Sequence, residues 1–125
     1  MLRVAAIPRI LEQINTDGVK GSALVTMEGA LLGYAGEMLP DVKAQVFGAV
    51  SSSMWDDFDE AGTNGTGELD MLFLSMDNGQ LAIARAGPQF LVCAYAMKAC
   101  GTGILRAKLK AISDYLADSL GALGS

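Results

Sequence analysis

The sequence predicts an α+β fold in which helices pack on a five-stranded antiparallel sheet. Two observations support this prediction: the chain contains five short apolar runs, several of them joined by tight turns, and three segments with apolar residues at helical spacing. The predicted order is αββαβββα. Strands joined by hairpins run antiparallel, because a parallel pair needs a long crossover. No repeat or long linker divides the 125 residues, so we expect one domain over 1–125.

The first helix and the first hairpin are predicted between residues 7 and 36. Four apolar residues recur at helical spacing, namely Ile7, Ile10, Leu11 and Ile14. The run Asn15-Thr16-Asp17-Gly18 then supplies a helix stop. The runs GSALVTM (21–27) and ALLGYAG (30–36) follow, separated by Glu28-Gly29, and they predict an antiparallel hairpin.

The longest predicted helix runs from Pro40 to about Phe58, because proline suits a first turn and Asp41 complements the helix dipole. Two apolar stripes follow this helix. The first contains Val42, Val46, Ala49, Val50 and Ser53, and the second contains Phe47, Met54 and Phe58 with Ser51 between them. This apolar face is wider than one contact with a sheet requires. We expect the helix to be buried on two sides, by a partner chain or deep within its own domain.

Three strands and a closing helix are predicted in the second half. The strand segments are LDMLFLSM (69–76), QLAIARAG (80–87) and QFLVCAYAM (89–97). Asp77-Asn78-Gly79 is a strong hairpin signal, and Gly87-Pro88 marks the next turn. The last helix spans about 103–120, and its apolar face consists of Leu105, Leu109, Ile112, Leu116 and Leu120.

The composition excludes several classes of partner. A net charge of −5 and a pI near 4.5 argue against nucleic acid and against adsorption to anionic lipid. No segment approaches the ~20 apolar residues that span a bilayer, so no direct membrane insertion is expected, and a membrane address would come from a partner. A hydrophobic fraction of 51% and a mean hydropathy of +0.34 are high for a soluble domain, which predicts apolar surface available to a partner.

The sequence offers little catalytic chemistry. Without histidine, Ser-His-Asp and Cys-His catalysis are excluded, and no phosphate-binding loop is present. We therefore expect no enzyme activity, cofactor, catalytic residue or metal ligand. Cys93 and Cys100 lack metal-site spacing and predict buried free thiols in a reducing compartment. Gly101 and Gly103, ahead of Arg106 and Lys108, fit a sharp turn better than an anion site.

One alternative is a calcium-binding loop at residues 57–68, DFDEAGTNGTGE. Four positions fit an EF-hand loop, namely Asp57, Asp59, Gly62 and Glu68. Ala61 supplies no oxygen ligand, and Asn64 stands where an apolar residue belongs. We therefore favour a solvated loop, with a calcium sensor as the alternative.

Trp55 has two interpretations. Buried tryptophan is enriched at interface hot spots, so it could anchor a partner at the end of the long helix. Ordinary packing in the core is the simpler interpretation.

Several stretches together resemble the roadblock family, and within it the subunits of Ragulator complexes. They are NTDGV (15–19), MEGALLGYAG (27–36), MW (54–55), DNGQLAIAR (77–85) and GTGILRAKLKAISDYL (101–116). The resemblance implies a roadblock/longin-like fold and a non-enzymatic scaffold. Such a subunit pairs with a second roadblock-fold subunit, with the long helices side by side and the following strands joined into one sheet.

The resemblance also implies partners and a location. A lipid-anchored Ragulator subunit would hold the pair on the cytosolic face of late endosomes and lysosomes. There the pair would recruit Rag-type small GTPases for amino-acid signalling to mTORC1. It would also recruit a partner for MAP kinase signalling. The contact residues carried over are Val46, Val50, Met54, Leu72 and Leu74. Residues 37–53 and 56–68 depart from the family pattern, which leaves open a homodimeric regulator of a small GTPase or a dynein light chain.

Overall fold

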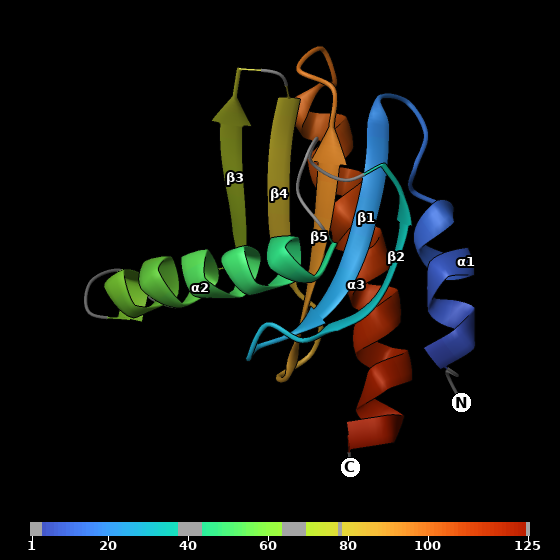
Figure 1. Cartoon of the computed structure of the whole chain (residues 1–125), viewed down its shortest axis with the longest axis vertical. Coiled ribbons are helices and arrows are strands. Elements are labelled where there is room, and N and C mark those ends of the chain that lie inside the picture. Colours follow the sequence, from blue (N-terminus) through green and yellow to red (C-terminus); the bar gives the residue numbers. More distant parts are fainter. Residues whose placement is uncertain (1–3, 38–43, 64–69, 78, 125) are drawn as a thin grey trace.

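The predicted order of elements is confirmed in a computed structural model, which describes residues 4–37, 44–63, 70–77 and 79–124 (Figure 1). A short 3-10 helix at Val4–Ala6 precedes the first helix. The elements are α1 (Ile7–Glu12), β1 (Val19–Thr26), β2 (Leu31–Gly36), α2 (Ala44–Thr63), β3 (Met71–Met76), β4 (Gly79–Arg85), β5 (Phe90–Ala96) and α3 (Thr102–Gly124).

The five strands form one antiparallel sheet in the order β2-β1-β5-β4-β3, as predicted. Hairpins join β1 to β2, β3 to β4 and β4 to β5, and the pairing of β1 with β5 closes the centre of the sheet. The predicted turn at 77–79 is confirmed by the register Met76↔Gly79. Strands β2 and β3 are therefore the two edges of the sheet.

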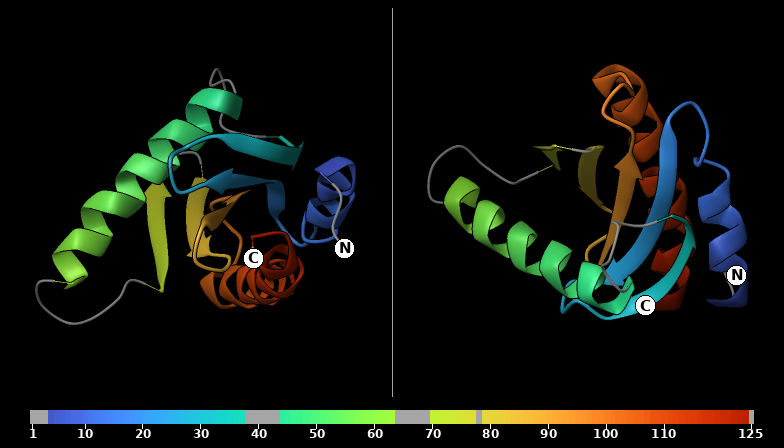
Figure 2. Two further views of the ribbon diagram at one scale, coloured as in Figure 1. Left: turned by 90° about the horizontal axis from the view of Figure 1, so that it is seen from below. Right: turned by 45° about the horizontal axis from the view of Figure 1, so that its top comes forward.

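Helices cover both faces of this sheet. Figure 2 shows α2 crossing one face, while α1 and α3 lie on the other. The larger core lies between the sheet and α3, where Leu105, Leu109 and Leu116 are fully buried. The smaller core lies under α2, around Trp55 and Ile83. The side chain of Leu120 lies outside the described residues.

Helix α2 continues to Thr63, five residues beyond its predicted end at Phe58. The predicted loop over 57–68 is therefore wrong for 57–63, because these residues form the last two turns of a helix. Glu60 and Ala61 are good helix formers, and no glycine interrupts the chain between Gly48 and Gly62. A helical backbone cannot wrap around a calcium ion as an EF-hand loop does, so the calcium interpretation is also wrong. Residues 38–43 and 64–69 lie outside the described ranges.

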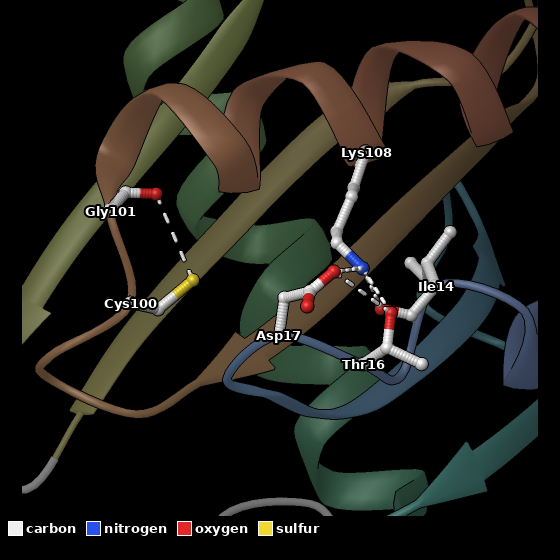
Figure 3. Close-up of polar contacts among 6 residues, drawn as sticks. All are labelled: Ile14, Thr16, Asp17, Cys100, Gly101 and Lys108. Carbon is white, nitrogen blue, oxygen red and sulfur yellow. Dashed lines mark hydrogen bonds and ion pairs between the residues drawn. The ribbon is translucent and has the colours of Figure 1, made fainter.

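A polar cluster ties the turn after α1 to α3 (Figure 3). The backbone of Asp17 is left-handed, with φ at 55°. Lys108 Nζ lies 3.2 Å from Asp17 Oδ2 and donates hydrogen bonds to the Ile14 carbonyl and the Thr16 hydroxyl. Lys108 is thus engaged within the fold, which accords with the turn interpretation of the segment before it.

Candidate protein-pairing surface

One face of α2 packs on the sheet through mostly small residues. The buried residues of this face are Gly48, Ser51, Ser52 and Trp55. A Cβ atom at Gly48 would lie 2.9 Å from Val25 Cγ1, so the missing side chain lets the helix approach β1 closely. Ser52 Oγ donates to the Met27 carbonyl at 2.6 Å and fixes the helix along its axis.

Trp55 fills the space under α2 and is fully buried. Its neighbours in this core include Val25, Ile83 and Cys93. The guanidinium carbon of Arg85 on β4 lies 5.8 Å from the ring centroid, within the range of a cation–π contact. Trp55 is therefore a core residue, and its interpretation as an anchor for a partner is wrong.

The two cysteines are buried free thiols, as predicted. Burial raises the pKa of the Cys93 thiol to about 12, and the nearby Ser51 hydroxyl, which favours the thiolate, offsets this only in part. Ser51 Oγ has no hydrogen bond of ordinary geometry within the described ranges, so burial dominates. A thiol held in this protonated state is a poor nucleophile and a poor metal ligand.

The opposite face of α2 is exposed and apolar. Val46 and Val50 retain 51% and 48% of their accessible surface. Val46, Val50 and Asp57 follow one another at spacings of four and seven residues, which places them on one stripe. Nothing in the described part of the chain buries this stripe. Burial of α2 on two sides is therefore wrong for the chain alone, because the sheet occupies only one side.

Edge strand β3 lies near the C-terminal half of α2, whereas Gly48 and Ser52 lie over β1 and the turn after it. The C-terminal end of α2 extends past β3, so the helix end and the strand edge lie on the same side of the molecule (Figures 1 and 2). Among the described strands, only β4 pairs with β3. In a hairpin, hydrogen-bonded and non-hydrogen-bonded residue pairs alternate along the strands. The pair that flanks a two-residue turn, here Met76↔Gly79, is a hydrogen-bonded one. The outer edge of β3 therefore presents the backbone groups of Met71, Phe73 and Ser75.

The five predicted contact residues fall into two groups. Val46 and Val50 point outward from α2. The other three belong to the core under α2, where Leu72 is 8% exposed and Met54 and Leu74 are half-buried. A second chain would therefore meet the side chains of the first group, but mainly the backbone of β3. Phe58 is exposed as well, although it follows the buried Ser51 by seven residues and so lies on the second stripe.

Two other site types find no support in the described ranges. No three His, Cys, Asp or Glu side chains gather closely enough there to hold a metal ion. Within the same ranges, no helix is both long and apolar enough to cross a membrane.

Comparison with known proteins identifies the family of this chain. Residues 10–96, which include both α2 and β3, match the family model of the Roadblock/LC7 domain. The chain belongs to the Roadblock/LC7 family. A relative from Caenorhabditis elegans, named "Ragulator complex protein LAMTOR2 homolog", is 32% identical over 116 residues, covering 93% of this chain and 90% of that protein. The predicted family is thereby confirmed.

Solved structures confirm the roadblock fold. MglB of Myxococcus xanthus superimposes with a TM-score of 0.86 at 17% identity, covering 98% of this chain and 95% of that one. A Roadblock/LC7 domain from Streptomyces avermitilis gives a TM-score of 0.82 at 15% identity, with 90% and 96% covered. At these identities the likeness establishes the fold alone.

Proposed function

We propose that this Roadblock/LC7 chain is a non-enzymatic scaffold subunit that pairs with a second roadblock-fold subunit through α2 and β3. The observation that carries the proposal is that α2 and β3 each leave a surface unsatisfied. Val46 and Val50 expose apolar area on α2, β3 exposes a regular backbone edge, and the C-terminal end of the same helix extends past that edge.

Pairing would satisfy both surfaces in one step. A second strand along β3 accepts and donates the hydrogen bonds that the edge otherwise leaves to water, and it removes an edge that invites aggregation. A second helix on the stripe of Val46 and Val50 buries apolar area, at about 25 cal/mol per Å² removed from water. Because Trp55 and Ser52 fix α2 on its own sheet, little reorganisation opposes this docking.

The proposed setting of the pair is a Ragulator-type complex. The supporting observation is the likeness over nearly the whole chain to the C. elegans Ragulator homologue. In this setting a lipid-anchored Ragulator subunit holds the pair on the cytosolic face of late endosomes and lysosomes. The pair then recruits Rag-type GTPases for amino-acid signalling to mTORC1. It also recruits a partner for MAP kinase signalling. The net charge of −5 is consistent with attachment through a partner rather than direct adsorption to anionic lipid.

Substitution of Val50 by aspartate tests this proposal. The chain is co-expressed with candidate roadblock-fold subunits of the same organism, and complexes are measured by sedimentation velocity. Val50→Asp places an uncompensated charge in the contact and lowers affinity on the order of 100-fold. Ile104→Asp is the matched control, because Ile104 is 50% exposed on α3, across the sheet. If Val50→Asp pairs as tightly as the wild type, the proposed surface is wrong. A homodimer that ignores every candidate would favour the self-pairing regulator instead.

A further inference from the structure

Strand β3 carries apolar side chains on the face of the sheet opposite to α2. Met71 and Phe73 pack against the larger core, whereas Leu72 and Leu74 belong to the smaller core under α2. Met71 and Phe73 are only half-buried. Helix α3 packs on β4 and β5, and no described helix makes an extended contact with β3 on this face (Figure 2). Met71 and Phe73 therefore form an apolar strip beside α3, which we call the β3 strip.

The flank of α3 that faces the β3 strip is basic. The other flank faces α1, because Lys108 pairs with Asp17 in the turn after α1. Helix α1 packs on β1 and β2, at the end of the sheet away from β3. Arg106 precedes Lys108 by two residues and therefore lies on the flank toward β3. Arg106 is exposed and forms no ion pair within the described ranges, whereas Lys110 pairs with Asp114.

Pairing through α2 and β3 would turn the β3 strip into the floor of a groove. The two α2 helices meet only if they lie on the same face of the joined sheet, so the two α3 helices share the opposite face. Each α3 lies over its own β4 and β5. Four strand spacings then separate the two α3 axes, which amounts to about 19 Å. The β3 strips of the two chains lie midway between these axes.

This separation fits one additional helix. Packed helices lie about 8–10 Å apart, so a helix midway between the two α3 axes contacts both. Sheet twist of about 20–25° per strand rotates this helix by about 40–50° from each α3, close to the commonest crossing angle of packed helices. The six residues of β3 span about 20 Å, which matches a helix of about 13 residues.

We propose that the groove over the β3 strip docks an amphipathic helix of a third chain. The helix lays apolar residues on Met71 and Phe73 and sets an acidic residue against Arg106. Exposed Asp70 and Asp77 stand at the two ends of β3, so the acidic residue belongs in the middle of the helix. This inference rests on the proposed function, because the groove exists only in the pair.

A displayed library of helical peptides serves as the probe. Phage carrying random 14-residue peptides in a helical scaffold, about the length of β3, are selected on the full-length chain paired with a co-expressed roadblock-fold subunit. Selected peptides are synthesised, and their Kd values for the pair are measured by fluorescence anisotropy. We expect amphipathic sequences with one apolar stripe and a central Asp or Glu.

Two variants locate the bound peptides. Phe73→Ser removes apolar floor, and Arg106→Glu reverses the charge beside it, so each should weaken binding about tenfold. Tyr115→Ser and Arg9→Glu are the matched controls, since Tyr115 is exposed on the flank of α3 toward α1 and Arg9 is exposed on α1. Both controls should bind as the wild type does. Sedimentation velocity shows which variants still pair, and Arg106→Glu carries the test if Phe73→Ser disturbs pairing.

Val50→Asp separates this inference from the proposed function. Loss of both pairing and peptide binding in this variant supports both. Pairing that survives Val50→Asp means that the proposed surface is wrong, and the inference falls with it. If Val50→Asp abolishes pairing, but no selected peptide binds the wild-type pair more tightly than the Arg106→Glu pair, only the docking of a third helix is overturned.

Discussion

The two edges of the sheet have the same backbone chemistry but different surroundings. Beside β2, helix α1 packs so closely that a Cβ atom at Gly33 would lie 2.8 Å from Ile7 Cγ2. The pairing of β2 with β1 is also irregular, with a register shift between Leu24 and Val25. Strand β3, in contrast, pairs with β4 in an unbroken register over its whole length. Within the described residues, no helix makes an extended contact with β3.

This difference indicates which edge can accept another chain. A bulged edge strand with a helix packed against it is a poor template for pairing, whereas a regular, bare edge is a good one. The C-terminal end of α2 extends past β3 (Figure 2). Surroundings, rather than composition alone, therefore distinguish the edges, since both strands are rich in apolar residues.

Alkaline pH should produce the largest effect, which is a loss in the free energy of unfolding. It acts on the folding of the chain rather than on pairing at either edge of the sheet. Cys93 lies in β5, at the centre of the sheet, with its pKa raised from 9.0 to about 12. Below pH 9 the thiol is protonated in both the folded and the unfolded chain, so its contribution to the free energy of unfolding is fully present. Between pH 9 and 12 only the unfolded chain loses the proton, so the free energy of unfolding falls by about 1.4 kcal/mol per pH unit. Urea unfolding across this window measures the slope.

Cys93→Ala should reduce this alkaline slope, whereas Cys100→Ala, which leaves Cys93 in place, should retain it. An unchanged slope in Cys93→Ala would assign the alkaline sensitivity to other groups.

Gly33→Val tests the covered edge. The added side chain collides with Ile7, so the free energy of unfolding should fall by about 1–3 kcal/mol. Gly103→Val is the control, since a Cβ atom there meets nothing within 4 Å. Pairing with a roadblock-fold subunit should be unchanged in the folded Gly33→Val protein. A loss of pairing without a loss of stability would mean that β2 takes part in the interface.

Proline substitution compares the edges directly, with the smallest expected effect. Ser75→Pro removes an outward N–H from β3 and leaves the bonds to β4 intact, so pairing should weaken by about 3- to 10-fold. Tyr34→Pro is the counterpart on β2. The Glu37 N–H donates to the Lys20 carbonyl and so points toward β1. Successive N–H groups of β2 point alternately toward β1 and away from it, so the Tyr34 N–H points to the outer side. Equal weakening by both variants, measured by titration calorimetry, would contradict the distinction between the edges.

Much of the fold was predictable because its signals are local. The turn at 77–79 and the leucine spacing of α3 each follow from a few neighbouring residues. The end of α2 was not predictable in this way, since Asp57 to Ala61 can continue a helix or enter a loop. The buried face of α2 was also misassigned. Its small residues Gly48, Ser51 and Ser52 carry no hydrophobic signal, yet they allow close approach to the sheet.

The candidate site was predictable only in part. Val46 and Val50 came from the family resemblance, and their exposure emerges only once the sheet is seen to occupy the opposite face of α2.

Hydrogen–deuterium exchange of the full chain, alone and in complex with a co-expressed roadblock-fold subunit, tests the central claim most directly. We predict that the amides of Met71, Phe73 and Ser75 exchange rapidly in the free chain and become protected in the complex. The Tyr34 amide on β2 should exchange at the same rate in both states. Protection of Tyr34 with no change along β3 would contradict the account, because the second chain would then lie on the other edge of the sheet.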